Sequence, residues 1–220
     1  MAGKSNTDRR RLVYDSLLKL NERSRLIDIT PLEVQPGWPP DKYLIDYYCR
    51  SITGINPEGE PLFGEHHQMK IYLDRDYPRT EPNMMFLTPI WHPNISSEEP
   101  RRICTDKATT WWAGKAVDEL VLQVAELIQY KHYHAKNEPP FPQDMTVAAW
   151  VINHAERRGL LGPNHPVDQR PLLVEHRIRQ NDEPQRMSRI RLGNPFSSAT
   201  VVPHEFRCPG CGLKTNLNSL

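Results

Sequence analysis

Three observations predict an α+β fold in which an antiparallel meander sheet lies between an N-terminal helix and later helices. Apolar residues alternate with other side chains over residues 43–49 and again over 69–73, which is the period of half-buried strands. Turn-forming residues fill the intervening stretch 56–64. The helical patterns come before and after these strands instead of between them, which favours helices grouped at the ends of an antiparallel sheet.

The first element is a helix over residues 6–26, with Asn6 or Thr7 as its capping residue. Its apolar face holds Val13, Leu17 and Leu20. The exposed side of its first turns carries Arg9, Arg10 and Arg11. Exposed charges on a helix are ordinarily a solvated face, so these arginines alone indicate no partner.

The remaining elements follow from the same periods. A third strand is expected at residues 84–87, between turn-forming prolines. From Ala116 onward the apolar residues keep uninterrupted helical spacing, and the acidic Asp118 suits the first turn of a helix. A last helix begins near Asp144 and stops at Gly159.

The pattern degrades beyond about residue 163, where prolines recur and the charge is high. We therefore predict a folded domain over residues 1–162 and an irregular C-terminal extension over residues 163–220. The sequence contains no internal repeat and no low-complexity tract.

Composition excludes several classes of protein. A formal net charge of +1 gives no general polyanion signal, so nucleic acid is not an expected partner. The four cysteines have irregular spacings and no apolar N-terminal segment precedes them, which favours a reducing, cytoplasmic setting over secretion. No apolar run approaches the roughly 20 residues that span a bilayer, so a membrane is not expected either.

One stretch carries the groups that acyl transfer through a thioester needs. Residues 91–95 read Trp-His-Pro-Asn-Ile, and Cys104 follows a short loop later. A thiolate is the reactive form of cysteine and nearby positive charge favours it. Such charge is supplied in the sequence by Arg101, Arg102 and Lys107. An Asn side-chain N–H can stabilise an oxyanion, which makes Asn94 the second candidate catalytic residue.

These residues resemble the core of the ubiquitin-conjugating E2 enzymes. The motif at residues 92–94, the cysteine after it, and Trp112 eight positions beyond that cysteine are in the family's order. Tyr77-Pro78 and the segment 85–90 also fall where the family places them. The resemblance covers about residues 6–160, and the ordered set is far more specific than any one tripeptide.

The resemblance implies a ubiquitin-conjugating (UBC) fold in which Cys104 accepts a ubiquitin-like modifier from an E1 activating enzyme and passes it to an amine. ATP is used by the E1, so catalysis itself requires no cofactor. Asn137 and Glu138 occupy the stretch in which the family orients the incoming lysine. The N-terminal helix resembles the family's E1-docking face, which makes Arg9, Arg10 and Arg11 candidate partner contacts.

Several positions depart from the family pattern. The loop from Asn94 to Cys104 is about two residues longer than usual and is charged. Arg79 stands where typical members place an aromatic residue for RING-type ligases, and residues 113–115 replace the usual Ser-Pro-Ala. A conventional RING ligase is therefore a doubtful partner. Such divergence fits the E2-like proteins of bacterial ubiquitin-like conjugation operons.

The C-terminal extension has a constellation of its own. Cys208 and Cys211 lie in the run Cys-Pro-Gly-Cys-Gly, which resembles one knuckle of a zinc ribbon. A structural zinc needs four ligands, so His204 and one more residue, or a second chain, would complete the site. The competing interpretation is an exposed turn without metal.

Three functions remain open at this stage. The leading one is an active E2-like transferase, the second is a catalytically silent UBC-like module that binds a modifier or partner, and the third is a cysteine hydrolase of modifier conjugates. A pure binding module has no chemical need for Cys104 together with Asn94, which favours the first over the second. A hydrolase would need a histidine beside Cys104, with His132 and His134 as the candidates.

Overall fold

The computed structural model describes residues 6–104, 112–139, 141–162 and 164–173, together with the backbone of four residues in the C-terminal extension. Those four form two short paired strands, β8 (Phe206–Arg207) and β9 (Lys214–Thr215). The chain divides into two compact units, residues 1–176 and 177–220, so the two strands belong to the second unit.

A five-stranded antiparallel sheet forms the centre of the first unit. Its strands, in spatial order, are β1 (Ile27–Leu32), β2 (Lys42–Tyr47), β5 (His67–Tyr72), β6 (Asn83–Phe86) and β7 (Arg101–Arg102). Alternate residues of β2 and β5 are buried, and the register places Tyr43 opposite Ile71 and Ile45 opposite Met69. One face of this sheet is therefore apolar and has to be covered.

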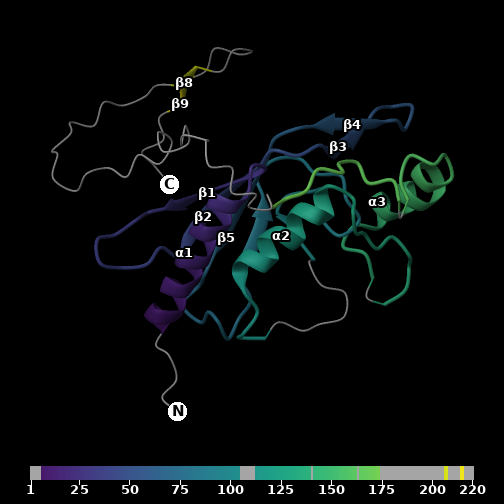
Figure 1. Cartoon of the computed structure of the whole chain (residues 1–220). Coiled ribbons are helices and arrows are strands. Elements are labelled where there is room, and N and C mark those ends of the chain that lie inside the picture. The colour runs from purple at the N-terminus through teal and green to yellow at the C-terminus, as the bar shows by residue number, and fades with distance from the viewer. Residues whose placement is uncertain are drawn as a thin grey trace, which may run out of the picture. The chain divides into compact units, whose positions relative to one another are not determined.

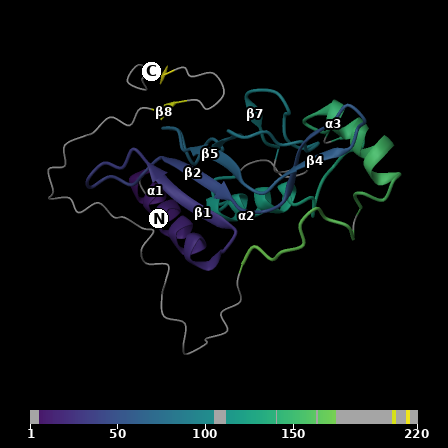
Figure 2. The ribbon, with the colours of Figure 1, turned by 90° about the horizontal axis from the view of Figure 1, so that it is seen from above.

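Two helices cover that face. The apolar faces of α1 (Asn6–Arg23) and α2 (Val117–Ile128) lie in one cluster with the buried side chains of β1, β2 and β5. Both views show α1 and α2 on the same side of the sheet (Figure 1, Figure 2). We call this cluster the main core, and it holds most of the large buried side chains of the unit.

A second core lies at the opposite end of the unit from α1. It is built by the hairpin of β3 (Ser51–Ile55) and β4 (Pro61–Gly64), by α3 (Met145–Trp150) and by the π-helical turn η1 (Val151–Glu156) that continues α3. Figure 1 shows β3, β4 and α3 gathered there. The indole N–H of Trp150 in α3 donates to the carbonyl of Gly59 at the tip of the hairpin (2.9 Å), and this bond joins α3 to the hairpin.

The residues just after η1 continue into a segment that packs along the first unit. Leu172 is buried in the main core, and the hydroxyl of Ser24 donates to its carbonyl (2.6 Å). Gln129, at the end of α2, accepts through its carbonyl from the N–H of Val167 (2.9 Å). Packing therefore continues to about residue 173, beyond residue 162, where we predicted the end of the folded domain.

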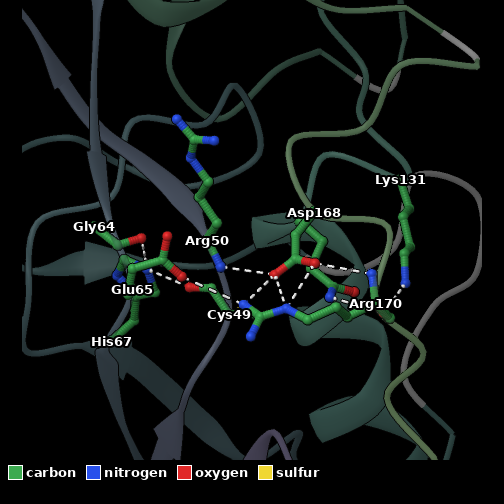
Figure 3. Close-up of polar contacts among 9 residues, drawn as sticks. Cys49, Arg50, Gly64, Glu65, His67, Lys131, Asp168 and Arg170 are labelled. Carbon is green, nitrogen blue, oxygen red and sulfur yellow. Dashed lines mark hydrogen bonds and ion pairs between the residues drawn. The ribbon is translucent and has the colours of Figure 1, made fainter.

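Asp168 fixes this segment to the turn that follows β2. Its carboxylate accepts from the backbone N–H of Arg50 (2.8 Å) and, through both oxygens, from the guanidinium of Arg170 (Figure 3). Burial alone would raise the pKa of Asp168, but these hydrogen bonds outweigh it and hold the pKa below its ordinary value. We call this group the Asp168 clamp. Burial, reinforced by the nearby charge of Asp168, raises the pKa of the Cys49 thiol beside it to about 12.

The structure confirms the predicted α+β class and the order of its main elements. The first helix ends at Arg23, three residues before the predicted end, and the helix predicted from Asp144 is divided into α3 and η1 before Gly159. The prediction missed β1, β7 and the β3–β4 hairpin. Cys49 is buried, as expected, but lies in a bend after β2 instead of on a strand. Among the described helices, none combines the length and the apolar character that a membrane span requires.

Candidate active site

Cys104 ends a loop whose two arms are hydrogen-bonded to each other. We call residues 94–104 the cysteine loop. The N–H of Cys104 donates to the carbonyl of Asn94 (2.9 Å), and the N–H of Ser96 donates to the carbonyl of Arg102 (3.0 Å). We call these two hydrogen bonds the rungs of the loop. Between them Ile95 and Ile103 form an antiparallel bridge. The two predicted catalytic residues are thus neighbours because the loop folds back on itself.

Each arm of the cysteine loop is also held from outside. The arm that leads into Cys104 contains β7, which pairs with β6 at the edge of the sheet. At the tip of this loop Glu98, Glu99 and Pro100 are exposed. The guanidinium of Arg101 pairs with Glu99 (2.8 Å). The exposed tip therefore lies beyond the hydrogen bonds that join the two arms beside Cys104.

The turn before the cysteine loop is buried and hydrogen-bonded. His92 is fully buried, and its Nδ1 accepts from the N–H of Asn94 (3.1 Å), so this histidine has a structural role. The Asn94 side chain is only 2% exposed, and its Oδ1 accepts from the backbone N–H of His134 (2.9 Å). With Oδ1 engaged in this way, the amide group of Asn94 is fixed in orientation.

Tyr130 joins the end of α2 to the same turn. Its hydroxyl donates to the carbonyl of Trp91, and its ring lies 4.7 Å from that of His92. Tyr130 has a positive φ of 58°, which is uncommon for a residue with a large side chain. Its N–H bonds to the carbonyl of Leu127 (2.8 Å) and the next N–H, of Lys131, bonds to that of Glu126 (3.0 Å), which is the Schellman pattern. A tyrosine therefore occupies the position that glycine usually takes.

Asp144 joins the start of α3 to the cysteine loop. One carboxylate oxygen caps the helix by accepting from the N–H groups of Thr146 and Val147 (both 3.0 Å). The other oxygen accepts from both the N–H (2.9 Å) and the hydroxyl (2.6 Å) of Ser97. Partial burial alone would raise the pKa of Asp144, but the hydrogen bonds from Ser97 and the capped amides hold it below its ordinary value.

The predicted acceptor-orienting residues, Asn137 and Glu138, are exposed in the stretch between α2 and α3. This stretch connects to Asn94 through His134, whose backbone N–H reaches Asn94 and whose ring Nε2 contacts the carbonyl of Glu138 (3.1 Å). The Glu138 carboxylate lies 4.0 Å from the ammonium of Lys136. The stretch therefore borders the turn that holds Asn94.

The three arginines of α1 have different surroundings. The Arg10 guanidinium is largely buried and donates to the carbonyls of Leu73 (3.2 Å) and Asp74 (2.7 Å), so it attaches α1 to the sheet. Arg9 donates to the carbonyl of Ala113 (3.3 Å), and Arg11 is exposed. Of the three, Arg11 is the one most open to a partner.

The predicted metal ligands Cys208, Cys211 and His204 lie outside the described residues. Within residues 6–104, 112–139, 141–162 and 164–173, no group of three or more His, Cys, Asp and Glu side chains is arranged to hold a metal ion. The zinc site thus stays a prediction about the C-terminal extension.

Comparison with known proteins tests the resemblance that the sequence suggested. The family model described as ubiquitin-conjugating enzyme matches residues 46–151. The chain is 31% identical over 119 residues to ubiquitin-conjugating enzyme E2 N of Macaca fascicularis, a match that covers 53% of this chain and 72% of that protein. The chain belongs to the ubiquitin-conjugating enzyme family. The fold described above is accordingly the UBC fold that was predicted.

Other relatives in the family match over a shorter share of their length. Ubiquitin-conjugating enzyme E2 K of Homo sapiens is 36% identical over 107 residues, which cover 48% of this chain and 50% of that protein. Ubiquitin-conjugating enzyme E2 21 of Caenorhabditis elegans is 34% identical over 99 residues, covering 44% and 43%. The chain thus spans about half the length of these two. A solved E2 domain from Toxoplasma gondii has 21% identity and a TM-score of 0.47, covering 67% of this chain and 90% of that one.

Sequence reasoning missed the site roles of Tyr130 and Asp144. For Tyr130, the available signal was that no glycine follows the apolar helix, so that another residue has to take the position glycine usually occupies. Asp144 was recognised as the start of a helix, because aspartate is a favoured N-cap residue. Its bonds to Ser97 span 47 residues of sequence, and no local pattern signals such a contact.

Proposed function

We propose that this protein is an E2-type conjugating enzyme that carries a ubiquitin-like modifier as a thioester on Cys104 and transfers it to an amine. The observation that carries this proposal is the hydrogen bond between the N–H of Cys104 and the carbonyl of Asn94 (2.9 Å). It keeps the cysteine beside an amide side chain that is itself fixed in place.

The chemistry needs two acyl transfers. The Cys104 thiolate attacks the carbonyl carbon of the thioester between the modifier and the E1, and the E1 thiolate leaves. A neutral amine then attacks the new thioester, the Cys104 thiolate leaves, and the amine loses a proton to solvent or a nearby base. Each attack places negative charge on the carbonyl oxygen, which the Asn94 side-chain N–H groups are suited to stabilise.

The acceptor amine is expected to approach past Asn137 and Glu138. A lysine attacks only in its neutral form, so a polar surface that orients and partly desolvates it aids the second transfer. These exposed residues belong to the stretch that is tied to Asn94 through His134. That connection supports the assignment, which came from resemblance alone.

For the E1, the proposal is a contact on the N-terminal half of α1. Beside this half lies a cavity of about 400 Å³ whose lining includes Arg10, Glu33, Trp38, Lys42, Tyr72 and Arg75. Trp38 is 64% exposed, so the rim of this cavity offers an apolar contact as well as charge. Arg11 is the arginine of the helix that we expect to reach the partner.

The surface that would receive a RING-type ligase supports the doubt about such a partner. Arg79 is exposed where typical members of the family have an aromatic residue. A Cβ atom on Gly114 would lie 1.7 Å from the ring of Trp112, so the indole itself covers this position. We propose that any ligase uses a different contact here.

The silent binding module and the hydrolase are less well supported. His134 and His132, the two histidines considered for a hydrolase, contact the carbonyl of Glu138 and the carboxylate of Glu126 respectively. The two hydrogen bonds that form the rungs of the cysteine loop hold Cys104 next to Asn94. A protein that only binds a modifier or partner has no need for this arrangement.

A charging assay tests the proposal. Wild type and Cys104→Ala are incubated with ATP, an E1 and candidate ubiquitin-like modifiers, and the products are separated with and without reductant. The expected result is a reductant-sensitive adduct in wild type that is lost in Cys104→Ala. An adduct that persists in the variant would show that Cys104 is not the acceptor. If wild type forms no adduct with any modifier while folded, the binding module becomes the better explanation.

We also propose zinc in the C-terminal extension. β8 and β9 pair antiparallel, with Arg207 opposite Lys214, so residues 208–213 with both cysteines connect two paired strands. In zinc ribbons a Cys-x-x-Cys segment supplies two thiolates to one ion, which supports the proposal. Elemental analysis should find about one zinc per one or two chains, lost in the Cys208→Ser, Cys211→Ser double variant. A folded, metal-free wild type would remove the proposal.

A further inference from the structure

We propose that Asp144 is a positioning residue that sets the geometry of the cysteine loop for the reaction of Cys104. Asp144 lies outside the loop, 40 residues after Cys104 in sequence, at the N-terminus of α3. The structural part of the inference stands on contacts alone, whereas its catalytic meaning rests on the function proposed above.

The first contact is between the carboxylate and the loop. Oδ2 of Asp144 accepts two hydrogen bonds from Ser97, one from the backbone N–H (2.9 Å) and one from the hydroxyl (2.6 Å). Bonds to an ionised acceptor are stronger than neutral ones, and here two converge on one oxygen. Ser97 is the last residue before the exposed tip, so these bonds separate the fixed part of the loop from the tip.

The second contact is between the backbone of Asp144 and the turn that precedes the loop. The N–H of Asp144 donates to the carbonyl of Pro93 (3.0 Å). One residue therefore holds the chain at Pro93 and again at Ser97. The segment between these two points contains Asn94, so Asp144 fixes both ends of the stretch that carries the proposed oxyanion donor.

The constraint reaches Cys104 through the rungs of the loop. Ser96, next to Ser97, bonds to the carbonyl of Arg102, and Asn94 bonds to the N–H of Cys104. The Cys104 arm is held to the sheet by β7, and the opposite arm is held to α3 by Asp144. If the second attachment is lost, the rungs have to keep the arms together against the motion of a charged, exposed tip. We call Asp144, Pro93 and Ser97 the Asp144 clamp.

The two oxygens of Asp144 have separate tasks, and this makes the clamp testable without loss of the helix. Oδ1 caps α3, and Oδ2 holds Ser97. Serine caps a helix about as well as aspartate, but its single short hydroxyl cannot serve both tasks. Asp144→Ser therefore keeps the cap and removes the loop contact. Ser97→Ala removes only the hydroxyl bond and serves as the milder second variant.

The first experiment needs no partner protein. The rate at which iodoacetamide alkylates Cys104 is followed by peptide mapping, and hydrogen exchange of the amides in residues 94–104 is measured alongside. The bonds to Ser97 should stabilise the closed loop by about 1 kcal/mol, so their loss in Asp144→Ser should raise the alkylation rate and the exchange rates about fivefold. A smaller change in the same direction is expected in Ser97→Ala. Asp168→Asn is the matched control, because it weakens a clamp that does not touch the loop.

The second experiment gives the clamp its catalytic meaning. Enzyme already charged on Cys104 is mixed with an amine acceptor, and single-turnover discharge is followed. The rate constant per thioester should fall about tenfold in Asp144→Ser, because small misplacements of reacting groups are costly. A variant that merely unfolded in part would instead lose charged enzyme and keep this rate constant.

Two results would overturn the proposal. One is alkylation and exchange within about 1.5-fold of wild type in both Asp144→Ser and Ser97→Ala, which would mean that the clamp adds no measurable attachment. The other is an equal response in Asp168→Asn, which would mean that global stability controls the loop. If wild type cannot be charged but the partner-free rates change as expected, the clamp stands and the proposed function fails.

Discussion

Two aspartates tie remote segments together in this molecule, and their surroundings differ. Asp168 is nearly buried and pairs with the guanidinium of Arg170 as well as with the backbone of Arg50 (Figure 3). Asp144 is partly exposed and takes all its bonds from neutral N–H and O–H groups. The Asp168 clamp joins residues 164–173 to the turn that follows β2, whereas the Asp144 clamp joins the start of α3 to the cysteine loop.

Because their surroundings differ, the two clamps should affect different properties: the Asp168 clamp the stability of the unit, and the Asp144 clamp the geometry of the cysteine loop. Asp168 is buried, whereas the Arg170 side chain that pairs with it is half exposed. Loss of the Asp168 carboxylate would leave the part-buried N–H of Arg50 without its charged acceptor and would release residues 164–173, so the Asp168 clamp should affect the whole unit. A cap and a loop contact at a partly exposed site can be lost with little effect on the core. The same chemistry, a carboxylate with several donors, therefore serves the fold in one place and the geometry of the cysteine loop in the other.

The largest effect is expected from Asp168→Ala. This change leaves the N–H of Arg50 without its acceptor and leaves the half-exposed guanidinium of Arg170 with Glu65 alone, which should lower the free energy of unfolding by about 2 kcal/mol. Urea denaturation measures it. Alkylation of Cys104 under native conditions should stay at the wild-type rate. An altered Cys104 rate would show that the two clamps are coupled and would break the comparison.

The sequence predicted what local patterns determine. The three helices follow from apolar spacing and from caps such as Asp144, because both are set within a few residues. β1 was missed because its alternation covers only residues 27–30 before Pro31, although an edge strand tolerates a proline. The family motif predicted Cys104 and Asn94 as site residues, but the sequence could not show that their backbones are hydrogen-bonded to each other.

Neither clamp could be predicted, for a physical reason. The partners of Asp168 and Asp144 lie 118 and 47 residues away, and the choice of partner depends on how the whole chain packs. Asp168 also lies where prolines and charges removed the helical signal, so the segment was assigned to an irregular extension. Irregular backbone can be as firmly held as a helix when carboxylates and carbonyls take its hydrogen bonds.

A smaller effect is expected from Tyr130→Phe, which tests a third attachment of the turn before Asn94. The change removes the hydroxyl that donates to the carbonyl of Trp91 and keeps the buried ring. Loss of this bond should cost about 1 kcal/mol of unfolding free energy. Hydrogen exchange around Asn94 should rise, as in the Asp144 variants.

Tyr133→Phe is the control for this change. Its hydroxyl donates to the carboxylate of Glu156 at an exposed position, so the loss should be only a few tenths of a kcal/mol. If the two variants lose the same stability, the contact with Trp91 has no special part in holding the turn. If hydrogen exchange around Asn94 rises in Tyr130→Phe but not in Tyr133→Phe, Tyr130 is a second residue, after Asp144, that holds the turn before Asn94 in place.

The smallest effect is a pH dependence that distinguishes the surroundings of the two clamps. His67 lies beside the Asp168 clamp, fully buried, with its Nε2 directed at the carbonyls of Cys49 (3.1 Å) and Gly64 (3.2 Å). Burial lowers the pKa of His67 below its ordinary value near 6.5, and the neighbouring His66 adds to this. The unfolded chain therefore takes up a proton at a pH where the folded protein does not.

Stability should accordingly fall as the pH drops below about 6.5, and this loss ends once the folded histidine is also protonated. The lowered pKa values of Asp144 and Asp168 affect stability in a more acidic pH range. A carboxylate with a depressed pKa loses its contribution to the free energy of unfolding only as the pH falls below about 3.9. Urea denaturation at pH 7.5 and 5.5 should thus give a larger decrease for wild type than for His67→Gln, which keeps an N–H donor but cannot titrate. An equal decrease in both proteins would mean that the loss of stability above pH 5 does not come from His67. The surroundings of the two clamps would then not differ in their response to pH in this range.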